Sequence, residues 1–370
     1  MADTEIDAAP QDLADIRRRI NEVDERIQAL INERARFAQQ VGVAKGELAA
    51  AVDYYRPDRE AEVLRNVIER NEGPLRNEEM LRLFREIMSA CLAQQEPLKV
   101  GYLGPEGTFT QTSVFKHFGH SVRALPFHTI DEVFQEVESG AADFGVVPIE
   151  NSTEGSVNNT LDMFLTSPLK IAGEIELRIE QHLLGRMTGL ENIKRVCAHE
   201  QSLAQCRGWL REYVPHLELI GVSSNAAGAR RARDEDGTAA IGPDVAADVY
   251  ELNVLVNNIE DRPDNATRFL VVGRDLLAAS GHDKTTILIS TSDTACGAGV
   301  LRLLLQPLAD HHVNMTRIES RPSRRKNWDY VFFIDIEGHA EESPVAEALV
   351  ELEKSSSLFR VLGAYPKAIG

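Results

Sequence analysis

Cysteine is scarce in this 370-residue chain, and its spacing is not that of a metal site. The four cysteines show no C-x-x-C pair and no neighbouring histidine cluster: Cys91, Cys197, Cys206 and Cys296. Zinc sites and disulfide frameworks usually depend on such paired spacing. We therefore expect reduced and mostly buried thiols, no metal site and no other cofactor.

Long apolar runs are also missing from the sequence. No segment approaches the ~20 apolar residues that a membrane-spanning helix requires. The segment from Met1 to Asp12 is short and acidic, and it lacks the apolar centre of a secretory signal peptide. These absences predict a cytoplasmic protein that does not enter membranes.

Basic residues are outnumbered, because 40 Lys and Arg stand against 58 Asp and Glu for a formal net charge of −18. Such a chain repels nucleic acid and anionic membrane surfaces. We therefore expect no nucleic-acid partner, and any anionic ligand has to be held by a local cluster of cations. The hydrophobic content of 43% in a chain of this length is sufficient for two or three packed domains.

The first hundred residues carry a helical pattern. From Leu13 to Val41 the apolar residues recur at steps of three and four, which predicts one helix of roughly thirty residues and on the order of 50 Å. One small domain cannot cover so long a stripe, so we expect a second copy of the chain to pack against it, in a homodimer or a higher homo-oligomer. Two shorter helices are predicted, from Pro57 to about Asn71 and from Asn77 to Gln95.

Arg34 interrupts the apolar stripe of the first helix. Lys45 follows eleven residues later, close to three helical turns, and therefore lies on about the same face. Two cations on one face can bind one anion. The alternative is that both side chains extend into solvent at the edge of the helix.

The pattern changes to alternating strands and helices after Pro97, which predicts a domain boundary near residue 98. We expect mainly parallel sheets in two small lobes around a cleft. Three polar segments follow or precede strands: 104–110, 147–155 and 265–269. The first contains glycines but no lysine at the spacing of a phosphate-binding loop, so a nucleotide site is disfavoured.

From Thr286 onwards, the order strand, helix, strand, strand, helix, strand predicts a ferredoxin-like domain.

The first segment resembles the all-helical chorismate mutases. The similar residues include Arg17 to Ile20, Glu33-Arg34, Val43 to Lys45, Asp58 to Glu60 and Arg82 to Phe84. The resemblance implies a site that binds the chorismate dianion and rearranges it to prephenate. Its catalytic residues would be Lys45 and Gln95, at the ether oxygen. Its substrate-binding residues would be Arg34, Arg59, Glu60 and, from the partner subunit, Arg17.

The three polar segments, in this order, resemble the prephenate dehydratases over roughly residues 99 to 275. The resemblance implies that Thr267 and Arg268 act on prephenate. Glu150 is the candidate acid, provided that burial raises its pKa. Thr267 is the candidate hydrogen-bond donor to the leaving hydroxyl, because an alcohol does not ionise near neutrality. The other residues that the resemblance places in the cleft are Asn151, Ser152, Gln205 and Ser224.

The last ninety residues resemble the ACT regulatory domains that are fused to this enzyme family. The similarity lies in Glu319-Ser320-Arg321-Pro322, which follows Asn314, and in an altered glycine-containing element, Gly297 to Val300. It implies that phenylalanine binds at Gly297, Ala298, Asn314 and the segment Glu319 to Pro322. The alternative is a purely structural dimerisation domain.

The sequence thus predicts a multidomain enzyme: an all-α chorismate mutase module at 1–97, a two-lobed α/β dehydratase module like the periplasmic binding proteins at 98–278, and an α+β ferredoxin-like ACT domain at 284–364. The predicted function is the conversion of chorismate to prephenate and then to phenylpyruvate in L-phenylalanine biosynthesis, with feedback inhibition by phenylalanine. Two alternatives are a non-catalytic amino-acid sensor, which leaves the cationic helical segment unexplained, and a fused enzyme with one inactive module.

Overall fold

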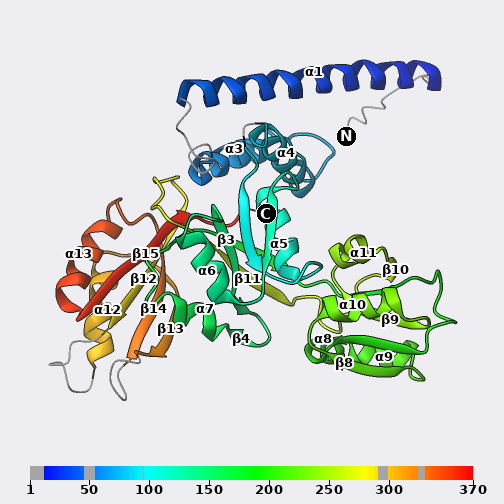
Figure 1. Cartoon of the computed structure of the whole chain (residues 1–370). Coiled ribbons are helices and arrows are strands. Elements are labelled where there is room, and N and C mark those ends of the chain that lie inside the picture. Colours follow the sequence, from blue (N-terminus) through cyan, green and yellow to red (C-terminus); the bar gives the residue numbers. More distant parts are fainter. Residues whose placement is uncertain (1–11, 46–54, 95, 291–298, 324–329, 370) are drawn as a thin grey trace, which may run out of the picture.

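The computed structural model describes residues 12–45, 55–94, 96–290, 299–323 and 330–369. Figure 1 shows a long helix lying over two shorter ones, a two-lobed body beneath them and a C-terminal sheet on the left. We call these parts the helical module (12–94), the two-lobed module (99–273) and the C-terminal module (283–366). The predicted multidomain fold class is confirmed.

The helical module has three described helices, α1 (Leu13–Lys45), α3 (Pro57–Glu69) and α4 (Asn77–Leu92). Pro57 starts α3, and Asp58 and Glu60 lie in its first turn, where the helix dipole favours negative charge. α3 and α4 bury residues such as Leu64 and Leu81. In contrast, α1 leaves its apolar stripe in solvent along its whole length, with Leu30 61% and Phe37 58% exposed.

The first lobe of the two-lobed module is built on a mixed sheet in the order β2-β1-β3-β11-β5, with β4 paired to β3. β1 lies parallel to β2 and β3, whereas β11 runs antiparallel to both β3 and β5. Its strands are β1 (Lys99–Leu103), β2 (Arg123–Phe127), β3 (Phe144–Asn151), β4 (Gly155–Ser156), β5 (Lys170–Arg178) and β11 (Ala266–Gly273). Its helices are α5 (Phe109–Phe118), α6 (Ile130–Glu138) and α7 (Asn158–Met163).

The second lobe has a sheet in the order β10-β6-β9-β7-β8. Its strands are β6 (His182–Gly185), β7 (Arg195–His199), β8 (Glu218–Val222), β9 (Thr238–Gly242) and β10 (Asn253–Val256), and its helices are α8 (Glu200–Gln205), α9 (Arg207–Tyr213), α10 (Asn225–Asp234) and α11 (Asp244–Tyr250). The expectation of mainly parallel sheets is wrong, since both sheets are mixed. The chain enters this lobe after β5 and returns through β11, and these two linking strands pair antiparallel in the first lobe.

The C-terminal module contains β12 (Asp283–Ser290), α12 (Val300–Asp310), β13 (Met315–Pro322), β14 (Tyr330–Glu337), α13 (Val345–Ser355) and β15 (Leu358–Pro366). The strands form an antiparallel sheet in the order β13-β14-β12-β15, in agreement with the predicted ferredoxin-like order of elements. Both helices bury apolar residues against this sheet, among them Leu304 and Leu352.

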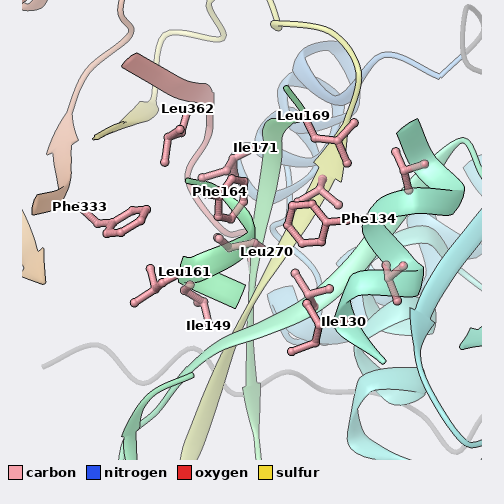
Figure 2. Packing of buried hydrophobic residues seen from close by; sticks show 14 of the residues in the cluster. Ile130, Phe134, Ile149, Leu161, Phe164, Leu169, Ile171, Leu270, Phe333 and Leu362 are labelled. Carbon is pink, nitrogen blue, oxygen red and sulfur yellow. The ribbon is translucent and has the colours of Figure 1, made fainter. Parts of the chain in front are cut away.

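The first lobe and the C-terminal module share one hydrophobic core. Phe333 of β14 and Leu362 of β15 pack with Leu161 and Phe164 of the first lobe and with Ile171 of β5, and Figure 2 shows these side chains facing one another. Removing the C-terminal module would therefore expose apolar surface of the first lobe.

Among the described residues, no helix is both long and apolar enough to cross a membrane. The same part of the chain contains no group of three histidine, cysteine, aspartate or glutamate residues placed to hold a metal ion. Cys91, Cys197 and Cys206 are buried free thiols. Cys296 lies outside the described residues.

Candidate active sites

A cavity of about 420 Å³ lies between α1, α3 and α4. Arg34 of α1 reaches it from one side, and Arg59 and Glu60 of α3 line another. Three residues that the sequence predicted to act together are therefore brought together. Two further arginines, Arg56 and Arg85, also line the cavity, so cations outnumber carboxylates on its wall.

The remaining residues predicted for this site are Arg17, Lys45 and Gln95. The interval from Arg17 to Arg34 corresponds to about 25 Å along a helix, so Arg17 lies far along α1 and its side chain is exposed. The side chain of Lys45 and the whole of Gln95 lie outside the described residues.

Glu60 has an unusual electrostatic environment. Burial raises its pKa to about 7, and Arg85, a hydrogen bond from Tyr55 and the charge of Arg34 oppose that rise. The carboxyl group therefore titrates near neutral pH, and the charges of Arg85 and Arg34 both favour its ionised form.

Arg85 was missed by the sequence analysis, although the signal was available. Arg85 lies on the apolar face of α4, because it is spaced at helical intervals of four, three and four residues with three apolar residues: Leu81, Met88 and Leu92. Arg34 likewise lies on the apolar stripe of its helix. Tyr55, which precedes α3, carried no comparable signal.

In the first lobe, Thr267 and Asn151 face each other across the ladder between β11 and β3. Asn151 Nδ2 lies 2.8 Å from Thr267 Oγ1, to which it donates a hydrogen bond. The same amide donates to Asn265 Oδ1 at 3.1 Å, and the Ser152 hydroxyl lies 3.3 Å from that oxygen. Since the Thr267 oxygen accepts from Asn151, its own proton remains available for a bound molecule.

Glu150 and Arg268 are also opposite each other in this ladder, but their side chains point to the other face. Arg268 Nη1 lies 2.6 Å from Asp335 of the C-terminal module, and its Nε lies 2.9 Å from Glu174. Glu150 Oε2 accepts from Arg317 Nε at 2.9 Å. The structure thus places Arg268 and Glu150 on the face of the ladder opposite Thr267, toward the C-terminal module, and the roles predicted for these two residues in the reaction stay predictions. Adjacent residues of a strand point to opposite faces.

The second lobe holds the other two residues predicted for the cleft. Gln205 ends α8 and accepts a hydrogen bond from Gln181 at 3.1 Å. Ser224 caps the N-terminus of α10, where its hydroxyl accepts from the Ala227 amide at 3.0 Å. The hydrogen bonds of the described residues do not connect Gln205 or Ser224 to the cluster at Thr267.

The predicted regulatory segment lies on β13, an edge strand of the C-terminal sheet. Glu319 accepts from the Ser156 hydroxyl at 2.8 Å, and Arg321 lies 2.8 Å from Asp162 of α7. These side chains therefore contact the first lobe. Ser320 and Pro322 alternate with them and are exposed, as is Asn314, whereas Gly297 and Ala298 lie outside the described residues.

Three family models match this chain: "Chorismate mutase type II" over residues 16–96, "Prephenate dehydratase" over 100–276 and "ACT domain" over 298–354. A bifunctional chorismate mutase/prephenate dehydratase of Pseudomonas aeruginosa is 52% identical, with 98% of this chain and 100% of that protein covered.

Two solved structures are also similar to the chain. The prephenate dehydratase of Arthrobacter aurescens in complex with L-Phe is 37% identical, with a TM-score of 0.66 over 72% of this chain and 89% of that one. A protein described as a novel type of quorum quenching acylase, GqqA, is 29% identical, with a TM-score of 0.67 over 73% and 98%.

Mutations on the two faces of the β3–β11 ladder should change the free energy of unfolding by different amounts. Arg268→Met leaves Asp335 and Glu174 buried without their guanidinium partner, so the free energy of unfolding should fall by about 3 kcal/mol or more. Thr267→Val, on the other face, should cost less than about 1.5 kcal/mol. Chemical denaturation of both variants checks this, and an Arg268→Met protein as stable as Thr267→Val would contradict the assignment of faces.

Proposed function

The chain belongs to the bifunctional chorismate mutase/prephenate dehydratases of L-phenylalanine biosynthesis, and on that basis we propose how its residues perform each step. The enzyme rearranges chorismate to prephenate and then converts prephenate to phenylpyruvate with loss of water and carbon dioxide. The helical module carries the first step, the two-lobed module the second, and the C-terminal ACT module the regulation. A cytoplasmic location remains a prediction from the sequence.

The mutase step needs charge complementarity more than it needs proton transfer. The rearrangement of chorismate is intramolecular, so the site must hold a dianion in a reactive conformation and stabilise charge on the breaking ether bond. Arg34 and Arg59 suit the carboxylates, because a guanidinium binds a carboxylate through two parallel hydrogen bonds. Glu60 accepts from the substrate hydroxyl. Lys45 and Gln95 serve the ether oxygen.

Completion of this site requires a second copy of the chain. The exposed stripe of α1 includes Ile20, Val23 and Ile27, all within the span between Arg17 and Arg34. If two α1 helices pack antiparallel and cross near residue 25, Arg17 of one copy lies beside Arg34 of the other. A dimer would thus cover the stripe and bring the partner's Arg17 to the cavity.

Changing Arg34 to Ala should lower the mutase rate about a hundredfold or more, equivalent to ~3 kcal/mol, because a cation that binds the substrate is lost. Prephenate turnover should be unchanged in the same preparation, which controls for folding. Chorismate consumption measured at saturating substrate checks this. A mutase rate within a few-fold of wild type would refute the assignment of this cavity.

Val23→Asp should separate the copies, because it places a charge at the centre of the apolar stripe. The matched control is Glu25→Ala, two residues away on the opposite side of α1. Light scattering should show a smaller mass for Val23→Asp, together with a large loss of mutase activity. If Val23→Asp keeps both the mass and the mutase activity of Glu25→Ala, α1 is not the dimer interface.

For the dehydratase step, the cluster at Thr267 consists of hydroxyl and amide groups. Aromatisation of the ring drives the loss of carbon dioxide and of the ring hydroxyl, so the enzyme must mainly assist the departure of that hydroxyl. We assign the assisting hydrogen bond to Thr267, whose oxygen accepts from Asn151 at 2.8 Å. The amide fixes the direction of the threonine proton toward the substrate.

Thr267→Val keeps the shape of the side chain and removes only the hydroxyl. Prephenate turnover should fall about a hundredfold or more, as for the loss of a donor that acts on developing charge. The mutase reaction, followed in the same protein, should be unaffected. Undiminished dehydratase activity would exclude this role for Thr267.

Feedback inhibition by phenylalanine would act through β13. Three side chains of β13 are hydrogen bonded to side chains of the first lobe: Arg317, Glu319 and Arg321. The Ser156 hydroxyl is bonded to both Arg317 and Glu319. Ser156 lies on β4, which pairs with Asn151 and Glu150. A phenylalanine that favours one position of β13 would therefore move β4 and the end of β3 that carries Asn151. The L-Phe complex of the related Arthrobacter dehydratase supports this ligand.

Ser156→Ala removes two hydrogen bonds between the ACT module and β4. Without phenylalanine, its prephenate turnover should stay within twofold of wild type, while the concentration for half inhibition should change about fivefold or more. Ser139→Ala, elsewhere in the first lobe, serves as the control. Inhibition curves that coincide for the two variants would mean that β4 does not transmit the signal.

A further inference from the structure

The mutase cavity adjoins a smaller cavity that all three modules share. Tyr55, Glu60 and Arg85 line both of them. The smaller one, of about 50 Å³, is completed by α5 and β5 of the first lobe, by Pro366 at the end of β15 and by the tail segment 367–369. The wall behind Glu60 is therefore supplied by the dehydratase module and the C-terminal tail.

Tyr55 belongs to the core of the dehydratase module, although it directly precedes the mutase helix α3. It is 7% exposed and packs with Val100, Phe118 and Phe144. Its ring centroid lies 5.4 Å from that of Phe118 and 5.3 Å from that of Phe144. The ring is therefore fixed by the module that performs the other reaction.

The hydroxyl of Tyr55 connects the two modules. It is hydrogen bonded to Glu60, and it lies 3.3 Å from His117 Nε2 of α5. Burial and the charge of Arg85 lower the pKa of His117 to about 3, so the imidazole is neutral and can donate one N–H to the tyrosine oxygen. The tyrosine proton then points to the Glu60 carboxylate.

The C-terminal tail binds the guanidinium of Arg85. Its Nη2 donates to the carbonyl of Ile369. The tail is itself fixed, because the Lys367 amide donates to His282 at 3.0 Å and the Lys367 ammonium pairs with Glu337 at 2.5 Å. Arg85 thus remains beside Glu60 through contacts that begin in the ACT module.

We propose that Tyr55 and Arg85 are positioning residues for the mutase reaction, held in place behind Glu60 by the dehydratase module and the C-terminal tail. The proposal rests on the assigned role of Glu60 at the substrate hydroxyl. Both residues favour the carboxylate form of Glu60, one by a hydrogen bond and the other by charge. Glu60 also faces Arg34, and the two cavities contain the other charged groups of this junction: Arg56, Arg59, Lys116, Glu174, Glu176 and Lys367.

The test is the pH dependence of mutase kcat/KM in the full-length enzyme. In the wild type the rate should fall with decreasing pH through about 7, as Glu60 becomes protonated. Tyr55→Phe and Arg85→Met each remove a group that lowers the pKa of Glu60, so this fall should move upward by about one pH unit. At pH 7 the loss should then be about fivefold, and it should shrink above pH 8.5.

Two further variants control this result. Arg85→Lys retains the charge and should restore most of the wild-type profile. Tyr102→Phe removes another buried hydroxyl from the same core, one with no hydrogen-bond partner among the described residues, and should leave the mutase profile unchanged. Prephenate turnover measured for every variant reports that the dehydratase module is folded.

Glu60→Gln distinguishes a failure of the assigned role of Glu60 from a failure of the positioning role of Tyr55 and Arg85. If Glu60→Gln lowers the mutase rate but Tyr55→Phe and Arg85→Met lower it equally at every pH, the two residues are merely structural and the inference is wrong. If Glu60→Gln retains the wild-type rate and profile, the assigned role of Glu60 fails, and the inference fails with it.

Discussion

The pairing of β3 with β11 is the constraint on which both the proposed dehydratase site and its proposed regulation depend. Asn151 is opposite Thr267 and Glu150 is opposite Arg268, and successive side chains of a strand point to opposite faces. One face of the ladder therefore carries the hydrogen bond that orients the Thr267 hydroxyl. The other carries the ion pairs with the ACT module, and neither set can shift without moving the shared backbone.

The ion pairs at this interface are largely buried. Arg268 keeps 18% of its side-chain surface exposed, and Asp335 keeps 3%. Buried charges of this kind stabilise poorly in comparison with apolar packing, but the loss of one partner is costly. Their arrangement is therefore suited to fixing one orientation of the ACT module on the first lobe, within the shared core of Phe333 and Leu362. Arg85 and Glu60 are both in the helical module, and Arg85 connects it to the C-terminal tail through the carbonyl of Ile369.

Much of this organisation could be predicted from the sequence. The apolar stripe of α1, the change of pattern at Pro97 and the order of strands in the last module were all visible as local periodicity. Arg34, Arg59 and Glu60 could be grouped because the first segment resembles the all-helical chorismate mutases. The alternation of residues 150 and 151 was also available, because neighbouring side chains of a strand point to opposite faces of the sheet.

The rest depended on contacts between distant segments. The sequence gives no indication that Arg317 reaches Glu150, that Asp335 reaches Arg268 or that residue 369 reaches Arg85. The antiparallel course of β11 follows from the return of the chain out of the second lobe, and strand spacing alone does not encode this. For the same reason Tyr55, which precedes a mutase helix, could not be assigned to the dehydratase core.

The central claim is that the Glu150 face of β3 connects the ACT module to the Thr267 face. A double-mutant cycle on phenylalanine inhibition of prephenate turnover, with Glu150→Gln and Arg317→Met made singly and together, tests it most directly. The account predicts that each change alters the phenylalanine concentration for half inhibition and that the double variant resembles the stronger single one. Independent effects that add in free energy, or no effect of either change, would contradict it.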